Sequence, residues 1–152
     1  MRLHIMTRPH ARRPDLMAVI GLRGYRITAP RKMIAGLMER KHEGFTAQDL
    51  CDGLPSVGRA TVFRTLKLFL EVGVICKLDG IDSAPIYSLC QSGHHHHTVC
   101  IICGSVEDLR LGTVERMLGT LCEDFPEQVV GHSFELYVDC KNRKNCPRNG
   151  KN

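Results

Sequence analysis

Apolar residues recur three and four positions apart along the first half of the chain, the spacing that turns one side of a helix toward a core. Polar capping residues and glycines mark where these segments begin and end. The pattern predicts four helices, which run from Asp15 to Gly24, from Thr28 to Gly44, from Thr46 to Gly53 and from Ser56 to Gly73.

Strand-like segments replace the helical spacing after residue 73. Residues 74–78 and 85–90 are rich in β-prone side chains, and the turn residues between them predict a hairpin. Helices followed by a short hairpin form a winged helix-turn-helix, here with one extra helix in front, and the last helix of that motif enters the DNA major groove.

The second half of the chain predicts a small mixed unit beyond a hinge at residues 91–93. Its predicted elements are strands at 98–103, 106–109 and 133–138 and a helix at 113–125. The predicted fold class is therefore α+β. An N-terminal winged helix-turn-helix DNA-binding domain would occupy 1–91, and a C-terminal domain would occupy 92–152.

The two halves of the chain also differ in charge. Residues 1–72 carry 13 Lys and Arg against 6 Asp and Glu, whereas residues 73–152 carry 8 against 10. A basic half indicates a polyanionic partner, although a solvated basic face without a partner is the alternative. The predicted outward positions of the last helix before the hairpin are Arg59, Thr61, Arg64, Thr65 and Lys67.

Composition excludes several classes. The 43% hydrophobic content is enough for a folded core, and the 5% aromatic content without Trp disfavours a stacking platform for single-stranded nucleic acid. No apolar run approaches the roughly 20 residues of a membrane span, and Met1–His10 lacks the apolar stretch of a secretory signal. We therefore expect a cytoplasmic protein with no membrane partner, in which cysteine clusters bind metal more often than they form disulfides.

Cys100 and Cys103, followed by Gly104, form a CxxC knuckle whose thiolates can reach one tetrahedral zinc. A redox CxxC is the alternative, but that motif normally lies at a helix N-terminus. Cys140 and Cys146 supply two further thiolates. Four thiolates leave no open coordination position, so the predicted zinc is structural.

Four consecutive histidines precede this knuckle. In an extended segment His95 and His97 would face one side, and His94 and His96 the other, so that one run can serve two sites. The first pair lies near the end of the hairpin, where Cys76 and Cys90 also lie. Thiolates with imidazoles suit zinc. The alternatives are a histidine tag and, for the two cysteines, small apolar strand residues.

Several motifs in this order resemble the ferric uptake regulator superfamily from about residue 15 to Cys146. They are Gly24–Arg31, Ala60–Leu66, Gly73-Val74, Tyr87 and the histidine run with Cys100-x-x-Cys103-Gly104. The resemblance implies a homodimeric, metal-dependent transcription regulator with an N-terminal winged helix and a C-terminal α/β dimerisation domain. Members of the superfamily sense iron, zinc, manganese, nickel, peroxide or haem.

The same resemblance implies roles for individual residues. Cys90 matches the hinge cysteine of zinc uptake regulators, and Cys76 stands where related zinc sensors place Asp or another ligand. Iron sensors usually carry a Glu near Ser88, which is absent here.

The implied regulatory metal ligands are Cys76, Cys90, His95 and His97. The implied secondary site is His94, His96, Glu115 and His132, in which His96 replaces the more usual Asp. The implied structural zinc ligands are Cys100, Cys103, Cys140 and Cys146. The implied DNA-binding residues are Arg26, Arg31, Arg59, Thr61, Phe63, Arg64 and Lys67, with Phe63 in place of the usual Tyr.

The sequence thus favours a zinc-responsive repressor that binds a palindromic double-stranded DNA operator as a homodimer. An iron-, manganese- or peroxide-sensing regulator of the same fold is the nearest alternative. A zinc enzyme would need a motif such as H-E-x-x-H or H-x-E with P-C-x-x-C, and neither is present. We therefore expect no catalysis and no small-molecule substrate. A zinc-ribbon interaction module that does not bind DNA is a third possibility.

Overall fold

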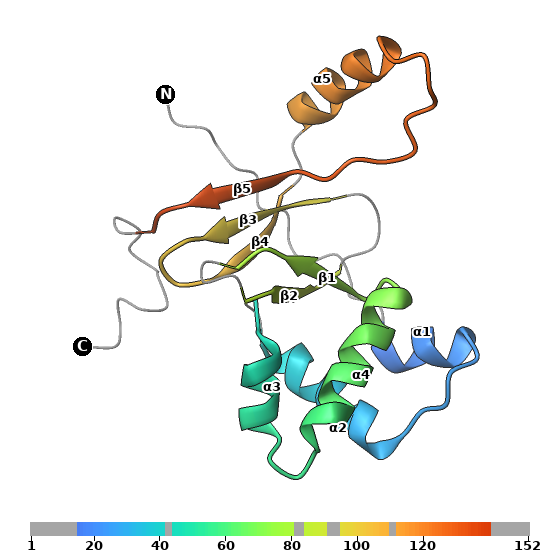
Figure 1. Cartoon of the computed structure of the whole chain (residues 1–152), viewed down its shortest axis with the longest axis vertical. Coiled ribbons are helices and arrows are strands. Elements are labelled where there is room, and N and C mark those ends of the chain that lie inside the picture. The colour runs from blue at the N-terminus through green and yellow to red at the C-terminus, as the bar shows by residue number, and fades with distance from the viewer. Residues whose placement is uncertain (1–14, 42–43, 81–83, 91–94, 110–111, 141–152) are drawn as a thin grey trace.

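The computed structural model describes residues 15–41, 44–80, 84–90, 95–109 and 112–140. Within them the chain forms five helices and five strands (Figure 1). The elements are α1 (Leu16–Leu22), α2 (Ala29–Arg40), α3 (Ala47–Gly53), α4 (Arg59–Glu71), β1 (Ile75–Leu78), β2 (Ile86–Leu89), β3 (His96–Cys100), β4 (Val106–Leu109), α5 (Gly112–Glu123) and β5 (Glu135–Val138). The α+β fold class is confirmed. No described helix is both long enough and apolar enough to cross a membrane.

Side-chain caps fix the starts of the first three helices. Asp15 accepts hydrogen bonds from the backbone of the first turn of α1, and Thr28 does so for α2. Thr46 and Asp49 form a reciprocal capping box at α3, with the Thr46 hydroxyl accepting from the Asp49 N–H at 3.1 Å. These three predicted starts are confirmed. Helix α4 begins after Gly58, without a side-chain cap, rather than directly after Ser56.

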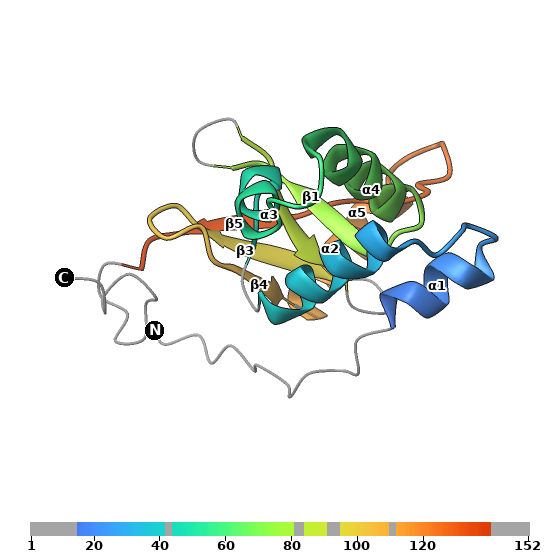
Figure 2. The same cartoon turned by 90° about the horizontal axis from the view of Figure 1, so that it is seen from below.

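Helices α1 to α4 surround one apolar core, which the β1–β2 hairpin closes. Phe45, Phe69, Ile34 and Met38 are almost completely buried within it. Seen from the helical end of the molecule, these helices lie in front of the strands (Figure 2). Helix α3, a short connection and α4 follow one another as in a helix-turn-helix, and the hairpin directly after α4 occupies the position of the wing.

The hairpin register places its two cysteines close together. Strands β1 and β2 are antiparallel, with Cys76 opposite Ser88, and the backbone N–H of Cys90 donates to the carbonyl of Val74 at 3.0 Å. An additional bridge joins Phe45 to Tyr87. This bridge ties the chain before α3 to the hairpin.

The second sheet has the order β4-β3-β5, with β4 antiparallel and β5 parallel to the central β3. Strand β3 spans His96–Cys100 instead of the predicted 98–103. The predicted C-terminal end was wrong because Ile101 to Cys103 form a turn. Gly104 follows with φ 71°, a left-handed conformation that glycine adopts without strain.

A small apolar joint links the hairpin to the second sheet. Leu78 and Ile86 of the hairpin pack against Val99 of β3 and Val106 of β4. The chain passes this joint at Gly44, where a Cβ would lie 2.6 Å from methyl groups of Ile86 and Val106. No larger residue fits at that position without displacing the joint.

We expect Thr46→Ala to lower the free energy of unfolding by about 1 kcal/mol, because the capping hydroxyl of α3 is lost. Denaturant titration followed by circular dichroism measures the change. Thr46→Ser is the matched control, since it retains the hydroxyl and should leave the free energy of unfolding close to that of the parent. Equal stability of Thr46→Ala and the parent would contradict the assigned cap.

Candidate metal centres and DNA-facing helix

Cys76, Cys90 and His95 form the first group of metal-ligating side chains, which we call the hinge cluster. Cys76 lies on β1, Cys90 follows β2, and His95 immediately precedes β3. Their ligand atoms all lie within 4.8 Å of one another, and the Cys76 Sγ is 3.6 Å from the His95 Nε2. The cluster therefore draws side chains from the hairpin and from the start of the second sheet.

The two sulfurs of the hinge cluster are joined in a disulfide, with the Cα atoms 5.7 Å apart. The sequence predicted thiolate ligands here, and a thiolate is the form of cysteine that binds a metal ion. A form of the protein that uses Cys76 and Cys90 as ligands is therefore one in which both sulfurs are reduced.

His95 also belongs to a second group, the strand cluster, together with His97 and Asp108. The rings of His95 and His97 have centroids 4.8 Å apart, and the His97 Nε2 is 3.8 Å from the Asp108 Oδ1. Burial, reinforced by the neighbouring His95, lowers the pKa of His97, against the opposing effect of Asp108. The lowered pKa favours the neutral form of the ring, which is the form that binds metals, and the buried Nε2 has no hydrogen-bond partner among the described residues. These features fit a metal ligand.

Asp108 is a candidate ligand that the sequence analysis did not identify. It lies directly opposite His97 in the β3–β4 register. Placing the turn of this antiparallel pair at Ile101–Gly104 would have brought the two residues together. The sequence prediction lacked the register of the β3–β4 pair, because the expected strand ended three residues too late and the turn was placed after it.

His96 turns to the other side of β3, as the alternation predicts, and forms the helix cluster with Glu115 and His132. The His96 Nε2 lies 2.5 Å from one carboxylate oxygen of Glu115, and the His132 Nε2 lies 3.6 Å from the other. Three of the four predicted secondary ligands therefore lie together. The fourth, His94, lies outside the described residues.

Cys100, Cys103 and Cys140 form the cysteine cluster, with their sulfurs within 4.8 Å of one another. Cys100 ends β3, and its parallel register with Val138 of β5 brings Cys140 to the same end of the sheet. The Gly104 N–H donates to the Cys100 carbonyl at 2.9 Å and closes the knuckle. Three converging sulfurs suit zinc. The predicted fourth ligand, Cys146, lies outside the described residues.

The exposed face of α4 carries the cations predicted to meet DNA. Arg59, Phe63, Arg64 and Lys67 are exposed, and Thr61 is half-buried. The Arg59 guanidinium lies 5.4 Å from the centre of the Phe63 ring, and it also donates to Gln48 of α3 at 2.9 Å. These contacts hold the side chain against the start of the helix.

Thr65 does not belong to that exposed face, because only 2% of its surface is accessible. It lies three residues after Val62 and four before Phe69, both of which are buried, so helical spacing turns it into the core. The prediction that it points outward was wrong.

The two cations predicted to bind DNA ahead of α4 lie near the start of α2. Arg26 is exposed and Arg31 is half-buried. The Arg31 guanidinium donates a hydrogen bond to the Arg26 carbonyl. This contact fixes the chain leading into α2.

A helix-turn-helix with a wing, followed by a sheet that carries clusters of metal ligands, defines a metal-responsive DNA-binding regulator. The family model described as the ferric uptake regulator family matches residues 22–137. The chain belongs to this family of transcription regulators.

Individual members of this family are similar to most of the chain. The ferric uptake regulation protein of Shigella flexneri is 30% identical over 122 residues, which cover 77% of this chain and 82% of the relative. The crystal structure of the Vibrio cholerae ferric uptake regulator has a TM-score of 0.68 and 25% identity, and the match covers 83% of this chain and 100% of that one. A zinc-bound manganese uptake regulator has a TM-score of 0.65 and 26% identity, with 83% of this chain and 98% of that one covered.

We expect Cys103→Ser to lose one tightly bound zinc ion per chain, because one sulfur of the cysteine cluster is removed. Elemental analysis after dialysis against a mild chelator gives the zinc content. Cys122→Ser is the matched control, since Cys122 lies on α5 outside every cluster of the described residues. A Cys103→Ser protein with the zinc content of the parent would disprove the role of the cluster.

Proposed function

We propose that this chain is a zinc-responsive repressor that binds a palindromic operator as a homodimer when its hinge metal site is filled. The observation that carries the proposal is the hinge cluster, in which sulfurs from the hairpin meet an imidazole from the start of the second sheet within 4.8 Å. Sulfur and imidazole ligands favour zinc over metals that prefer oxygen. The zinc-bound manganese uptake regulator described above is a protein of similar fold that holds zinc.

The regulatory site would take Cys76, Cys90, His95 and His97 as ligands, with Asp108 beside His97. His95 belongs to both the hinge cluster and the strand cluster, so it connects the sulfur ligands to the rest of the set. Bound zinc supplies coordination bonds between these side chains. The cysteines fix the hairpin end of the site, and the histidines fix the β3 end. Together they would hold the DNA-binding and second domains in one orientation.

The two domains are proposed to divide at residues 91 and 92, with DNA binding in 1–91 and dimerisation in 92–152. The Vibrio cholerae ferric uptake regulator has DNA-binding domains that are structurally rearranged in its crystal structure, which supports a division of this kind. In this chain α4 would enter the major groove, and Arg26 and Arg31 would contact the duplex beside it. The residues of α4 proposed to face DNA are Arg59, Thr61, Phe63, Arg64 and Lys67. The protein would act in the cytoplasm, without catalysis.

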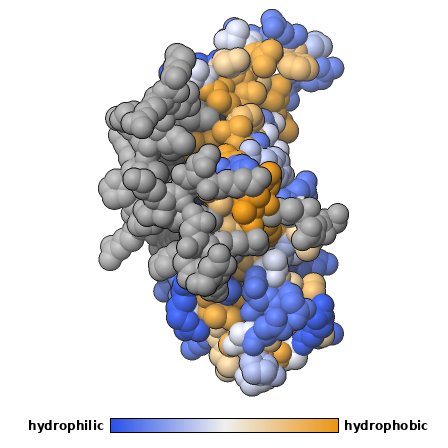
Figure 3. All heavy atoms as spheres, turned by 90° about the vertical axis from the view of Figure 1, so that its left-hand side faces the viewer, coloured by the Kyte–Doolittle hydropathy of each residue, from blue (hydrophilic) through white to orange (hydrophobic). Residues whose placement is uncertain are grey.

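A second copy of the chain is the proposed occupant of an exposed apolar face. Helix α5 has no buried residue. Met117 and Leu121 on it, and Phe125 just beyond its end, are more than half exposed, at 63%, 53% and 59%. Tyr137 of β5 adds to this apolar exposure. Figure 3 shows hydrophobic atoms gathered at the end of the molecule where Figure 1 places α5. Pairing two such faces would bury them and set two recognition helices at a fixed spacing.

The cysteine cluster and the helix cluster are proposed to bind two further metal ions. The cysteine cluster, with Cys146, would hold a structural zinc. The helix cluster, with His94, would form a secondary site on the opposite side of β3 from the strand cluster. Its carboxylate and imidazole ligands accept several divalent metals.

Iron or manganese sensing is a second candidate, favoured by the strand cluster. Two imidazoles and one carboxylate, from His95, His97 and Asp108, are a ligand set that suits these metals without any contribution from sulfur. This alternative differs from the zinc proposal in a checkable way, since it makes Cys90 dispensable for the metal response.

We expect zinc to tighten binding of the reduced protein to DNA from its own promoter region by roughly 5- to 150-fold, the usual range of allosteric coupling. Fluorescence anisotropy at buffered free concentrations of zinc, ferrous iron and manganese measures the effect. Cys90→Ser should lose the response to zinc, whereas Cys51→Ser, a change in α3 away from the clusters, should keep it.

Three outcomes separate the candidates. A Cys90→Ser protein that keeps the zinc response of the parent shows that the hinge ligands are assigned wrongly. A response to iron or manganese at physiological free metal, with none to zinc, favours the second candidate. Absence of DNA binding at every metal concentration indicates an interaction module instead.

We expect Arg64→Ala to weaken operator binding by about 1–3 kcal/mol if the guanidinium contacts a base edge, because that is the range for such contacts. Arg40→Ala is the matched control. It makes the same charge change at an exposed position in the last turn of α2, at the opposite end of that helix from Arg31, and should leave operator affinity nearly unchanged. Equal effects of the two substitutions, measured by the same anisotropy assay, would argue against α4 as the recognition helix.

A further inference from the structure

The hinge cluster contains two sulfurs with two mutually exclusive states. Each can be a thiolate available to a metal ion, or both can be joined as in the present structure. We propose that Cys76 and Cys90 form a reversible oxidation site, at which hydrogen peroxide converts the metal-binding dithiol into a disulfide that no longer binds metal. The consequence for DNA binding rests on the function proposed above, but the thiol chemistry does not.

The hairpin holds the two cysteines in place independently of the bond between them. Four cross-strand pairs, from Ile75–Leu89 to Leu78–Ile86, set the register. The Cys90 N–H extends this pairing by donating to the Val74 carbonyl at 3.0 Å. The resulting Cα separation of 5.7 Å lies within the range that disulfides require. The bond can therefore form and break with little movement of the backbone.

The same sulfurs are placed for metal binding. The Cys76 Sγ lies 3.6 Å from the His95 Nε2, and all three ligand atoms of the cluster lie within 4.8 Å. When the two sulfurs are paired, neither is a thiolate, so the site of Cys76, Cys90 and His95 loses the form of cysteine that binds a metal ion. Oxidation and metal binding thus compete for one pair of atoms.

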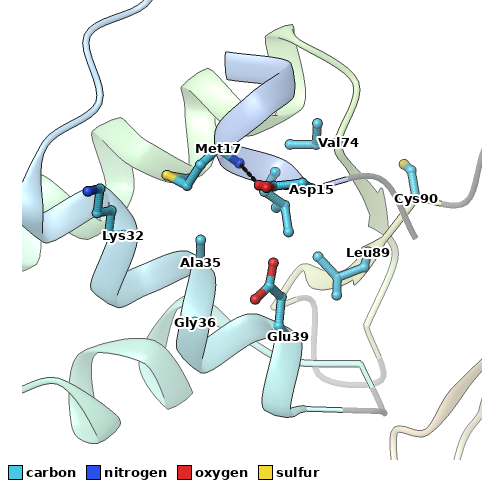
Figure 4. A pocket seen from close by; sticks show the side chains of 10 residues that line it. Asp15, Met17, Lys32, Ala35, Gly36, Glu39, Val74, Leu89 and Cys90 are labelled. Carbon is cyan, nitrogen blue, oxygen red and sulfur yellow. Dashed lines mark hydrogen bonds between the residues drawn. The ribbon is translucent and has the colours of Figure 1, made fainter. Parts of the chain in front are cut away.

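Cys90 lies beside a pocket large enough to admit a small oxidant. This residue lines a pocket of about 450 Å³ between α1, α2 and the hairpin, as Figure 4 shows. The charged side chains around it are Asp15, Glu39 and Lys32, so the lining carries more negative than positive charge. Such a lining repels anionic oxidants but not neutral hydrogen peroxide.

Two of the three sulfurs in the cysteine cluster are better protected than the hinge pair. Cys100 and Cys140 are only 2% and 5% exposed, whereas Cys103 is half-buried. Cys76 and Cys90 are both half-buried, and Cys90 lines the pocket. Because susceptibility to oxidation follows exposure as well as thiolate character, brief treatment should oxidise the hinge pair before Cys100 and Cys140.

The reaction balances with one equivalent of peroxide. The Cys90 thiolate attacks one peroxide oxygen, the O–O bond breaks, and hydroxide leaves, giving a sulfenic acid on Cys90. The Cys76 thiolate then attacks the Cys90 sulfur and expels a second hydroxide as the S–S bond forms. Two protons convert both hydroxides to water, and two electrons pass from sulfur to peroxide. A dithiol such as dithiothreitol reverses the change by thiol–disulfide exchange.

The test uses the 152-residue chain, reduced, loaded with zinc and treated briefly with hydrogen peroxide. We expect a peptide cross-link between Cys76 and Cys90 in non-reducing mass spectrometry, together with release of zinc from the hinge site. Operator affinity should fall to the value of the protein lacking hinge zinc. Dithiothreitol followed by zinc should restore all three measurements. Cys51→Ser, as a control, should respond as the parent does.

The Cys76→Ser variant lacks one proposed ligand, so its metal content and DNA affinity before peroxide treatment are compared with the same variant's values after treatment. It should form no intramolecular cross-link to Cys90, and its remaining metal and DNA binding should not show the reversible loss seen in the parent.

Three results would overturn the proposal. The first is a Cys76–Cys90 disulfide that dithiothreitol does not reduce in the folded protein. The second is peroxide treatment that yields no disulfide between these residues. The third is a disulfide that forms while the hinge zinc stays bound. The mass and zinc measurements use no DNA. A failure of metal-dependent operator binding in the reduced protein would therefore overturn the proposed function through a separate measurement.

Discussion

Successive side chains of a strand point to opposite faces, and three of the four ligand clusters depend on this property of β3. His97 faces Asp108 on β4, whereas His96 faces Glu115 and His132, and Cys100 closes the strand at the knuckle. Strands on both sides hold β3, so its register is fixed. A slip of one residue would exchange the ligands of the clusters and turn apolar Val99, which is now completely buried, out of the core.

The hairpin imposes the same kind of constraint on sulfur. Cys76 lies within β1 and Cys90 just beyond β2, and the antiparallel register sets the distance between them before any metal or bond is considered. A rigid pair of this kind suits both proposals, because a metal site needs ligands held in position and a reversible disulfide needs two sulfurs within reach. One element of backbone geometry would thus serve both the proposed metal response and the proposed response to oxidation.

Local chemistry made the helices and the faces of the histidine run predictable. The caps at Asp15, Thr28 and Thr46 depend on residues within one turn, so the sequence identifies them directly. Asp108 escaped notice because its partner His97 lies across a strand pair whose register depends on where the turn is placed. The disulfide was not predicted because the same two residues also fit a metal site, and residue types alone do not select between these states. Thr65 was misplaced because its polarity was given more weight than its helical position.

The joint between the hairpin and the second sheet bears on how the proposed hinge metal site would control the molecule. The helical core buries side chains from every element between α1 and β2, whereas the joint consists of Leu78, Ile86, Val99 and Val106. Shape at this joint is demanding, since Gly44 leaves no room for a side chain, but only four buried apolar residues form it. Ligands that bind across a large interface add little to an orientation already fixed by packing. Ligands that bridge a small one have a greater share in setting that orientation. The hinge cluster, like this joint, draws side chains from both the hairpin and the start of the second sheet. The state of two sulfurs and one imidazole would therefore be able to alter the placement of a whole recognition helix.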